Sequence, residues 1–172
     1  MRTRMSDSFV CSICGQPHTG APLSWGPDAP KAWADIAPDQ REGRGELGTD
    51  QCVIDDKQFF VRGRIEIPVV DTKQTFAWLV WVEVSPRDFF SMSELWKTIG
   101  REKKAPIYDA CLANELQIYE SSILGVSVKV HTRPVGERPF FVVTGDHQVG
   151  NEQRNGISSH HVQQIADILL AS

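Results

Sequence analysis

The residues best suited to chemistry lie near the N-terminus, in the stretch CSICGQPH (residues 11–18). Two thiolates separated by two residues can bind one metal ion, because the turn between them folds the chain back. Gly15 follows the second cysteine and lets backbone amides approach the sulfurs without a Cβ clash. His18 is close enough in the chain to supply a third ligand. The spacing therefore predicts a metal site that contains Cys11, Cys14 and His18.

A closed, structural zinc site needs a fourth ligand, and Cys52 is the best candidate for it. Cys52 stands at the start of the first regular strand, so a bound metal would hold both ends of the irregular segment 19–50. Cys111 or His147 could replace His18 or Cys52 in this set. The predicted ligands of the structural zinc ion are Cys11, Cys14, His18 and Cys52.

Roles besides zinc binding stay open for the CxxC pair. A redox-active pair usually begins a helix after a strand, and Pro17 with the surrounding loop composition argues against that arrangement. A complete zinc ribbon or a rubredoxin-type iron site would have a second CxxC pair, which this chain lacks. Two cysteines without a ligand in a small turn are the remaining alternative.

A second group of polar residues lies in the segment 145–159, GDHQVGNEQRNGISS. We expect a loop there, with a turn at Asn155 and Gly156 and with serines that cap the following helix. If the loop folds on the edge of a sheet, a buried Glu–Arg pair beside a histidine could bind an anion or transfer protons. A role in holding the loop or contacting a partner is favoured over catalysis. The binding residues predicted here are His147, Glu152, Gln153 and Arg154.

The elements that must position these residues begin with a hairpin. The string CVID, a turn at residues 55–57 and the string FFVRGRIEIPV predict two paired strands. In the second strand, Arg62 and Arg64 alternate with apolar residues, and with Lys57 they predict a solvent-exposed strand face. The next strand, residues 75–84, is apolar on both faces, as expected of a central strand.

Helices and further strands follow. Ser85 and Pro86 are a suitable N-cap and first residue for a helix, whose apolar stripe should be core. That stripe comprises Phe89, Met92, Trp96 and Ile99. We expect one or two helical turns around Cys111, strands at 124–133 and 138–145, and a last helix capped by Ser158 or Ser159. The pattern predicts an α+β fold, with a mainly antiparallel sheet of about five strands, two principal helices and an N-terminal CxxC knuckle.

Length and composition restrict the class of protein. A chain of 172 residues predicts a single domain over 1–172, in which residues 9–50 pack on an α+β body formed by residues 51–172. The net charge of −4 argues against non-specific binding to nucleic acids. The longest apolar run, residues 76–82, is too short to span a membrane, and the N-terminus lacks the apolar region of a secretory signal. We therefore expect a bacterial cytoplasmic protein, in which thiols stay reduced.

Four strings occur together in this chain: CSICGQPH, DQCVIDDKQFFVRGRIEIPV, FAWLVWVEVS and EQRNGIS. Together they resemble a bacterial family, the domain of unknown function family 2199, in order from about Phe9 to Leu169. The resemblance implies no established activity. It does imply that the two knuckle cysteines, the following histidine and the cysteine before VID belong together. The family's string HPLAxEQRNGI reads HQVGNEQRNGI here, so that His147 and the Glu152–Arg154 run match while the intervening residues differ.

Two functions are compatible with these residues. The first is a zinc-stabilised cytoplasmic binding protein, such as an adaptor, a regulator or an immunity-type protein, whose partner is another protein rather than a membrane or a nucleic acid. The alternative is a metal-dependent hydrolase with an open zinc position, in which Glu152 would be the base and Arg154 would stabilise an oxyanion. A thiol redox protein that uses Cys11 and Cys14 is a weaker third alternative. The number of zinc ligands separates the first two, since four ligands close the site to water.

Overall fold

The structure is a computed structural model that describes residues 9–10, 17–18 and 21–171. The strands in this part of the chain are β1 (Phe9–Val10), β2 (Pro17–His18), β3 (Ser24–Trp25), β4 (Gly45–Leu47), β5 (Gln51–Ile54), β6 (Gln58–Pro68), β7 (Thr75–Val84), β8 (Tyr108–Leu112), β9 (Ser127–His131) and β10 (Phe140–Val143). The helices are α1 (Lys31–Ala34), α2 (Pro86–Glu94), α3 (Arg101–Lys104), α4 (Gln148–Asn155) and α5 (Ser159–Ala171), with a 3-10 turn η1 (Pro38–Gln40). The predicted α+β class is confirmed, while the CxxC segment lies outside the described residues.

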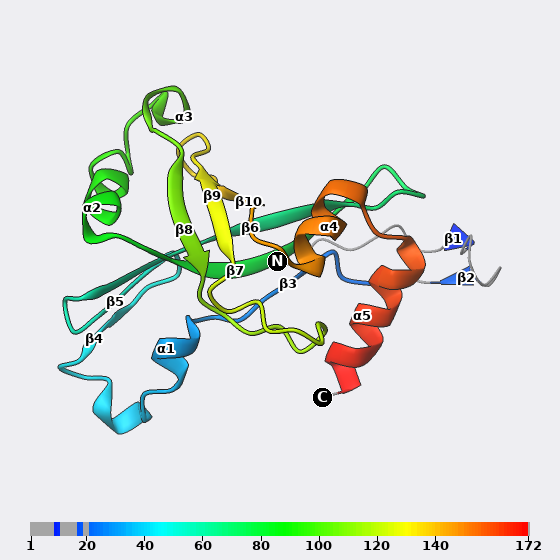
Figure 1. Ribbon diagram of the computed structural model, residues 1–172, viewed down its shortest axis with the longest axis horizontal. Coiled ribbons are helices and arrows are strands. Elements are labelled where there is room, and N and C mark those ends of the chain that lie inside the picture. The colour runs from blue at the N-terminus through cyan, green and yellow to red at the C-terminus, as the bar shows by residue number, and fades with distance from the viewer. Residues whose placement is uncertain (1–8, 11–16, 19–20, 172) are drawn as a thin grey trace.

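Five strands, β6 to β10, form a closed barrel. Each pairs antiparallel with the next along the chain, and β10 returns to pair in parallel with β6 (Figure 1). With the short strands β3, β4 and β5, the sheet in the described part of the chain has eight strands, more than the roughly five that the sequence predicts. Strand β5 is the first strand of the predicted hairpin, whereas β3 and β4, at two and three residues, are too short to leave an alternating apolar pattern.

Gly63 allows the barrel to close. On one edge of β6, Arg62 N–H bonds to Asp50 O just before β5, and Arg64 N–H bonds to Pro139 O just before β10. Gly63 lies at this change of partner, where an added Cβ would stand 2.6 Å from the oxygen of Pro139. Only a residue without a side chain lets β10 come this close to β6.

The core has two parts. The larger fills the barrel with alternate side chains of each strand, of which Ile65, Trp78 and Phe141 are fully buried. The smaller lies on the outer face of the sheet, around Trp81, and is covered by the segment that carries α1. Trp33 belongs to this second part, so α1 packs on the outer face of the sheet.

The predicted turn of the hairpin and the predicted N-cap of the first long helix are confirmed. Asp55 and Asp56 both have positive φ, as a tight turn between β5 and β6 requires. The side chain of Ser85 accepts a hydrogen bond from the Asp88 amide and caps α2. Trp96, in contrast, lies beyond the end of α2 and is 38% exposed, and Ile99 is 82% exposed, so the predicted core stripe ends before them.

The secondary structure predicted around Cys111 is wrong. The segment around Cys111 forms strand β8 instead of helical turns. Its neighbours in the sheet, β7 and β9, supply backbone partners on both sides, and this pairing outweighs the local helix preference of the Ala and Leu residues. In the described part of the chain, no helix is long and apolar enough to cross a membrane.

Candidate functional site

Part of the predicted metal site cannot be placed. Cys11 and Cys14 lie outside the described residues, and of His18 only the backbone is described, as part of β2. Zinc binding by these three residues therefore stays a prediction. Within residues 9–10, 17–18 and 21–171, no group of three or more His, Cys, Asp or Glu side chains could hold a metal ion.

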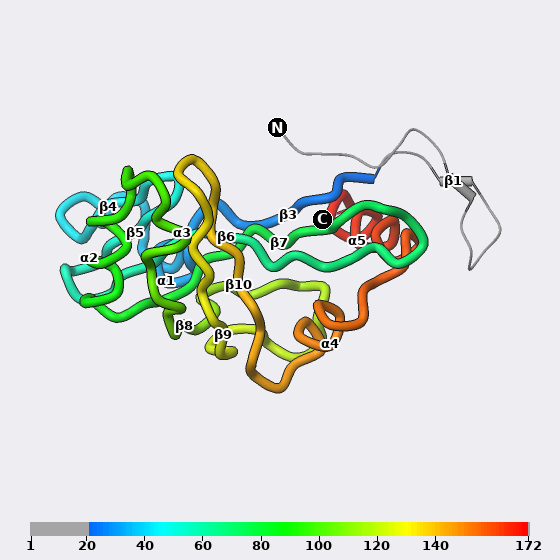
Figure 2. The backbone as a smooth tube through the Cα atoms, turned by 90° about the horizontal axis from the view of Figure 1, so that it is seen from above, coloured from blue at the N-terminus to red at the C-terminus, as the bar shows by residue number. Residues whose placement is uncertain are grey.

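Cys52 lies in an apolar environment. Its surface is 1% exposed, and it packs in the outer core part with Phe60 and Trp81. Burial raises the pKa of its thiol to about 11, so the thiol is protonated at neutral pH. Strand β5, which carries Cys52, lies at the opposite end of the molecule from β2, which carries His18 (Figure 1), and away from α5 (Figure 2). The structure thus does not bring Cys52 close to the strand of His18.

The polar segment before the last helix is itself helical, because residues 148–155 form α4 where the sequence predicts a loop. His147 is buried at its N-cap, and its Nδ1 accepts a hydrogen bond from the Val149 amide. The second ring nitrogen of His147, Nε2, lies 3.0 Å from the carbonyl oxygen of Ser121. Both ring nitrogens therefore have partners inside the protein, and the binding role of His147 stays a prediction.

Gln153 and Arg154 also differ from the prediction. The Gln153 side chain accepts from the Val143 amide and donates to the Phe141 carbonyl, so that it takes the place of a neighbouring strand along β10. Arg154 is exposed and donates to Asn151. Residues two positions apart on a helix face different directions, so Glu152 and Arg154 do not form the predicted pair.

Glu152 instead meets Tyr119 and His161. The Tyr119 hydroxyl donates to Glu152 Oε1 at 2.5 Å and accepts from the buried Trp78 indole at 3.0 Å. His161 Nε2 lies 3.4 Å from Glu152 Oε2. Burial and the Glu152 carboxylate both raise the pKa of Tyr119. This cluster ties α4 and α5 to the barrel core, and the side chain of Glu152 is 12% exposed.

A different part of the molecule contains a larger polar site. An open hollow of about 880 Å³ lies where the β9–β10 turn meets the segment between α2 and α3, beside β6. We call this hollow the arginine pocket. Its charged lining consists of Arg64, Lys97, Arg101, Arg133, Arg138, Asp50, Glu66 and Glu137. Five cationic side chains therefore face three carboxylates in a protein whose net charge is −4.

Glu66 holds two of the arginines. Arg64 Nε and Arg133 Nη1 each donate to Glu66 Oε2 at 3.2 Å, and Arg133 also bonds to Oε1. Burial disfavours the charge of Glu66, but Arg133 and Arg64 outweigh burial and lower its pKa. Arg133 also lies over the ring of Phe140. The single negative charge of Glu66 thus offsets only one of the two positive charges of Arg64 and Arg133.

The guanidinium group of Arg101 donates its hydrogen bonds to backbone carbonyl oxygens. The residue is 6% exposed and donates to the carbonyls of Trp96, Arg133, Pro134 and Glu137 at 2.7–3.2 Å. These bonds hold the β9–β10 turn against the start of α3. Carbonyl oxygens satisfy the donors of Arg101 without cancelling its charge. The floor of the pocket therefore keeps a positive potential.

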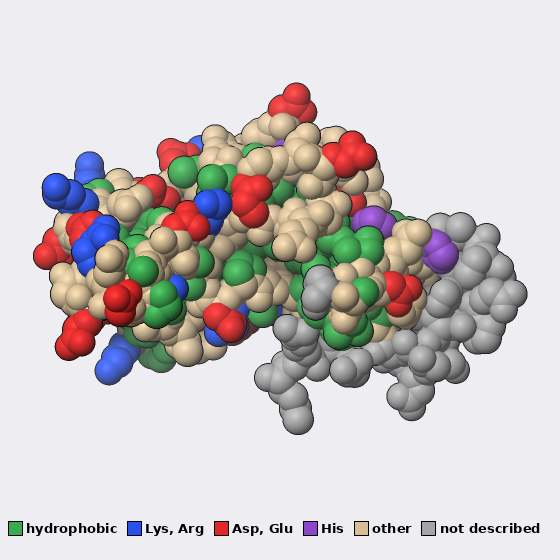
Figure 3. Space-filling model, turned by 90° about the horizontal axis from the view of Figure 1, so that it is seen from below, with side chains coloured by type: hydrophobic (Ala, Val, Ile, Leu, Met, Phe, Trp, Pro, Cys, Tyr) green, Lys and Arg blue, Asp and Glu red, His purple; other side chains and the backbone are tan. Residues whose placement is uncertain are grey.

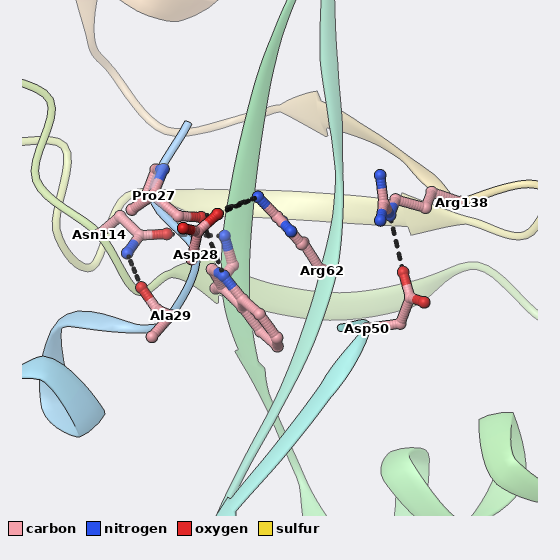
Figure 4. Close-up of polar contacts among 8 residues, drawn as sticks. Pro27, Asp28, Ala29, Asp50, Arg62, Asn114 and Arg138 are labelled. Carbon is pink, nitrogen blue, oxygen red and sulfur yellow. Dashed lines mark hydrogen bonds and ion pairs between the residues drawn. The ribbon is translucent and has the colours of Figure 1, made fainter. Parts of the chain in front are cut away.

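Arg138 and Arg62 complete the site on the side of Asp50 (Figure 4). Arg138 Nε donates to Asp50 Oδ1 at 2.7 Å. Arg62 reaches away to the carbonyl of Pro27 at 3.0 Å and to Asp28 at 3.6 Å. Burial and the neighbouring Arg138 both lower the pKa of Arg62. Two cations thus lie close together here, and each is held by a different carboxylate.

A small apolar cavity continues from the arginine pocket. Its volume is about 40 Å³, and Val61, Met92, Leu95 and Val130 contribute to its walls. It shares Trp96, Arg101 and Arg133 with the arginine pocket. We call this cavity the apolar throat. The whole site therefore combines a cationic hollow with a short apolar extension toward the barrel interior.

The sequence reveals little of this site. Arg62 and Arg64 are predicted to lie on a solvent-exposed face, but the side chain of Arg62 is 11% exposed and that of Arg64 is 33% exposed. Arg101 belongs to a charged segment that is typical of a surface loop. The one signal in the chain is the run Arg133–Arg138, where two arginines flank a Pro-Val-Gly-Glu turn. No pattern in the sequence predicts that this turn contacts residues 64 and 101.

The fold and the site define an α+β barrel protein with a cationic hollow that is open to solvent. The chain belongs to the family described as "Uncharacterized protein conserved in bacteria (DUF2199)", whose model matches residues 10–157. No significant match was found among curated proteins or among solved structures. Within the matched region, Gly63 lets the barrel close and Gln153 pairs with β10.

Proposed function

We propose that this protein works by binding a partner, and that the arginine pocket holds an anionic group of that partner. The observation that supports this proposal most directly is the surplus of cations in the pocket, where one carboxylate, Glu66, is shared by Arg64 and Arg133. Guanidinium groups bind carboxylates through paired hydrogen bonds in a fixed geometry. Because Glu66, Phe140 and backbone carbonyls already hold the arginines, little side-chain entropy is lost on binding.

The structural zinc ion belongs to this proposal as support for the N-terminal segment, not as part of the binding site. The hydrolase alternative has less support. It needs Glu152 and Arg154 to act together beside an open metal position, yet Glu152 pairs with Tyr119 and His161 while Arg154 bonds to Asn151. A carboxylate whose neighbours fill its surroundings is poorly placed to activate water.

Nuclear magnetic resonance titration of the ¹⁵N-labelled protein with citrate at constant ionic strength tests the proposal. We expect shifts concentrated on the amides of residues 97, 101, 133 and 135–138. Arg64→Gln should weaken citrate binding by about tenfold, since it removes one charge-assisted contact. This variant leaves Glu66 paired with Arg133, so the fold should persist.

Arg87→Gln is the matched control, because Arg87 lies exposed on α2 and does not line the arginine pocket. It changes the net charge by the same amount as Arg64→Gln. Equal weakening by the two substitutions, or shifts spread over other surfaces, would show that citrate responds to overall charge. Either result would refute the arginine pocket as the anion site.

A further inference from the structure

The surroundings of the arginine pocket indicate what kind of partner carries the anionic group. Trp96 and Val135 line the pocket and are 38% and 39% exposed. Ile99 stands in the chain between Lys97 and Arg101, which line the pocket, and is 82% exposed without itself being a lining residue. Large apolar side chains at this exposure are costly to leave in water, and their grouping beside a hollow is typical of a binding surface. Tryptophan and arginine are also the residues that most often dominate protein interfaces.

The charges of the pocket favour carboxylates over a nucleic acid. Five cations and three carboxylates leave a surplus of two positive charges, which one or two acidic side chains would balance. A phosphate backbone carries one charge every few ångströms, and the three carboxylates of the pocket would repel it. On the face seen in Figure 3, Lys and Arg side chains are likewise interspersed with acidic ones. The surface thus suits a short acidic segment.

The shape favours a segment of chain over a small molecule. Pockets for small molecules enclose most of their ligand, whereas the arginine pocket is open to solvent. A second hollow, of about 370 Å³, continues along the outside of α2 and β5 and shares Trp96 and Lys97 with the pocket. An extended peptide could lie along both hollows. The apolar throat, at about 40 Å³, offers room for one small apolar group beside the arginines.

We propose that the arginine pocket and its apolar rim bind an acidic segment of another protein, in which a carboxylate side chain meets Arg64 and Arg133 and a neighbouring apolar side chain packs on Trp96 and Ile99. This inference rests on the proposed function and specifies its partner. The carboxylate would share the guanidinium groups that Glu66 holds in place. The apolar side chain would cover surface that is exposed in the free protein.

Selection from a random 12-residue peptide library displayed on phage, with Arg64→Glu protein for counter-selection, tests this inference. We expect the enriched peptides to contain an aspartate or glutamate next to a large apolar residue. Binding of a fluorescein-labelled enriched peptide should weaken about tenfold in Arg64→Gln and severalfold in Ile99→Ser. Ile99 is almost fully exposed, so its replacement should leave the fold intact. Arg87→Gln is again the control and should bind like wild type.

The outcomes separate the inference from the proposed function. Citrate binding without enrichment of acidic peptides would overturn the inference and leave the proposed function standing. Loss of both would refute both. If a single-stranded DNA oligonucleotide displaced the labelled peptide as well as unlabelled peptide does, the site would be a general polyanion surface, and the acidic protein segment would be rejected. An enriched peptide that is insensitive to Ile99→Ser and Arg64→Gln would place the contact elsewhere and also reject it.

Discussion

Polar groups from distant parts of the chain contact the carboxylate of Glu152. Tyr119 and His161 both interact with it, so the three side chains form one constrained titratable cluster. Glu152 raises the pKa of His161, although burial opposes this. Burial by itself would raise the pKa of Glu152, but His161 and the Tyr119 hydrogen bond outweigh it and lower that pKa. The proton on His161 therefore stabilises the fold fully below its ordinary pKa of 6.5, and this contribution is lost as the pH rises through the raised value. The charge on Glu152 stabilises fully above 4.5 and is lost as the pH falls through the lowered value.

His161→Gln should consequently be most destabilising between pH 4.5 and 6.5. We expect a loss of about 1 kcal/mol, which corresponds to a fall of roughly 2–4 °C in melting temperature for a chain of this size. The difference from wild type should shrink at alkaline pH, where His161 is neutral in both the folded and the unfolded protein. Thermal melts over a range of pH measure this difference in stability. The same melts on Glu152→Gln and on the His161→Gln/Glu152→Gln double variant give the interaction energy between the two side chains. A difference that does not vary with pH would contradict the ion pair.

The strands and helices depend on close contacts between elements that are distant in sequence. Gly63 lets β10 approach β6, and at Gly156, which has a φ of +83°, an added Cβ would lie 2.8 Å from Pro68 O. The Ile157 amide then donates to Pro68 O and the Val70 amide donates to Ile157 O, which joins the end of α4 to the end of β6. Glycine is required at both places because a side chain would occupy space that backbone already fills.

Gly63→Ala should open the barrel at the β6–β10 contact. The added methyl group would lie 2.5 Å from Phe141 Cζ and 2.6 Å from Pro139 O, so one strand must move. We expect a destabilisation of about 2–3 kcal/mol, measured by urea denaturation. Gly48→Ala is the control, because the nearest atom to its added methyl group is 3.4 Å away. A Gly63→Ala protein as stable as Gly48→Ala would refute the role of Gly63 in closure.

At the scale of the whole molecule, the two ends of the barrel differ in chemistry. The arginine pocket lies at the end with α2 and α3, while the Glu152 cluster and α5 lie toward the end where β1 and β2 are found (Figure 1). Cys52 belongs to the first end, in the outer core part. If a zinc ion binds Cys11 and Cys14, its effect should therefore concern the N-terminal segment more than the binding surface.

Elemental mass spectrometry on protein purified without a metal-affinity tag should find one zinc ion per chain, lost in Cys11→Ser and in Cys14→Ser. Cys52→Ala should retain the metal, because Cys52 packs among apolar side chains at the opposite end of the molecule from β2 (Figure 1). Cys111→Ser is the control for loss of a thiol elsewhere. Zinc lost from Cys52→Ala would instead restore Cys52 to the ligand set, and a wild-type protein without metal would end the zinc hypothesis.

The sequence by itself determines the elements whose signals are local. The Asp55–Asp56 turn, the Ser85 cap and the apolar strand β7 each depend on residues within a few positions of one another, and the structure confirms all three. Strand β8 shows the limit of this reasoning. Its backbone pairs with β7 and β9 outweigh its local helix preference, and those partners lie far away in the chain.

Only the tertiary structure decides the candidate site. Arg64, Arg101, Arg133 and Arg138 come from three separate segments, and each alone has the composition of a solvated surface. They meet because β10 closes on β6 at Gly63 and because Arg101 binds the carbonyls of the β9–β10 turn. Register and closure depend on interactions between residues that are distant in sequence, and no short pattern in the chain encodes them. The charges were present in the sequence, but their common location was not.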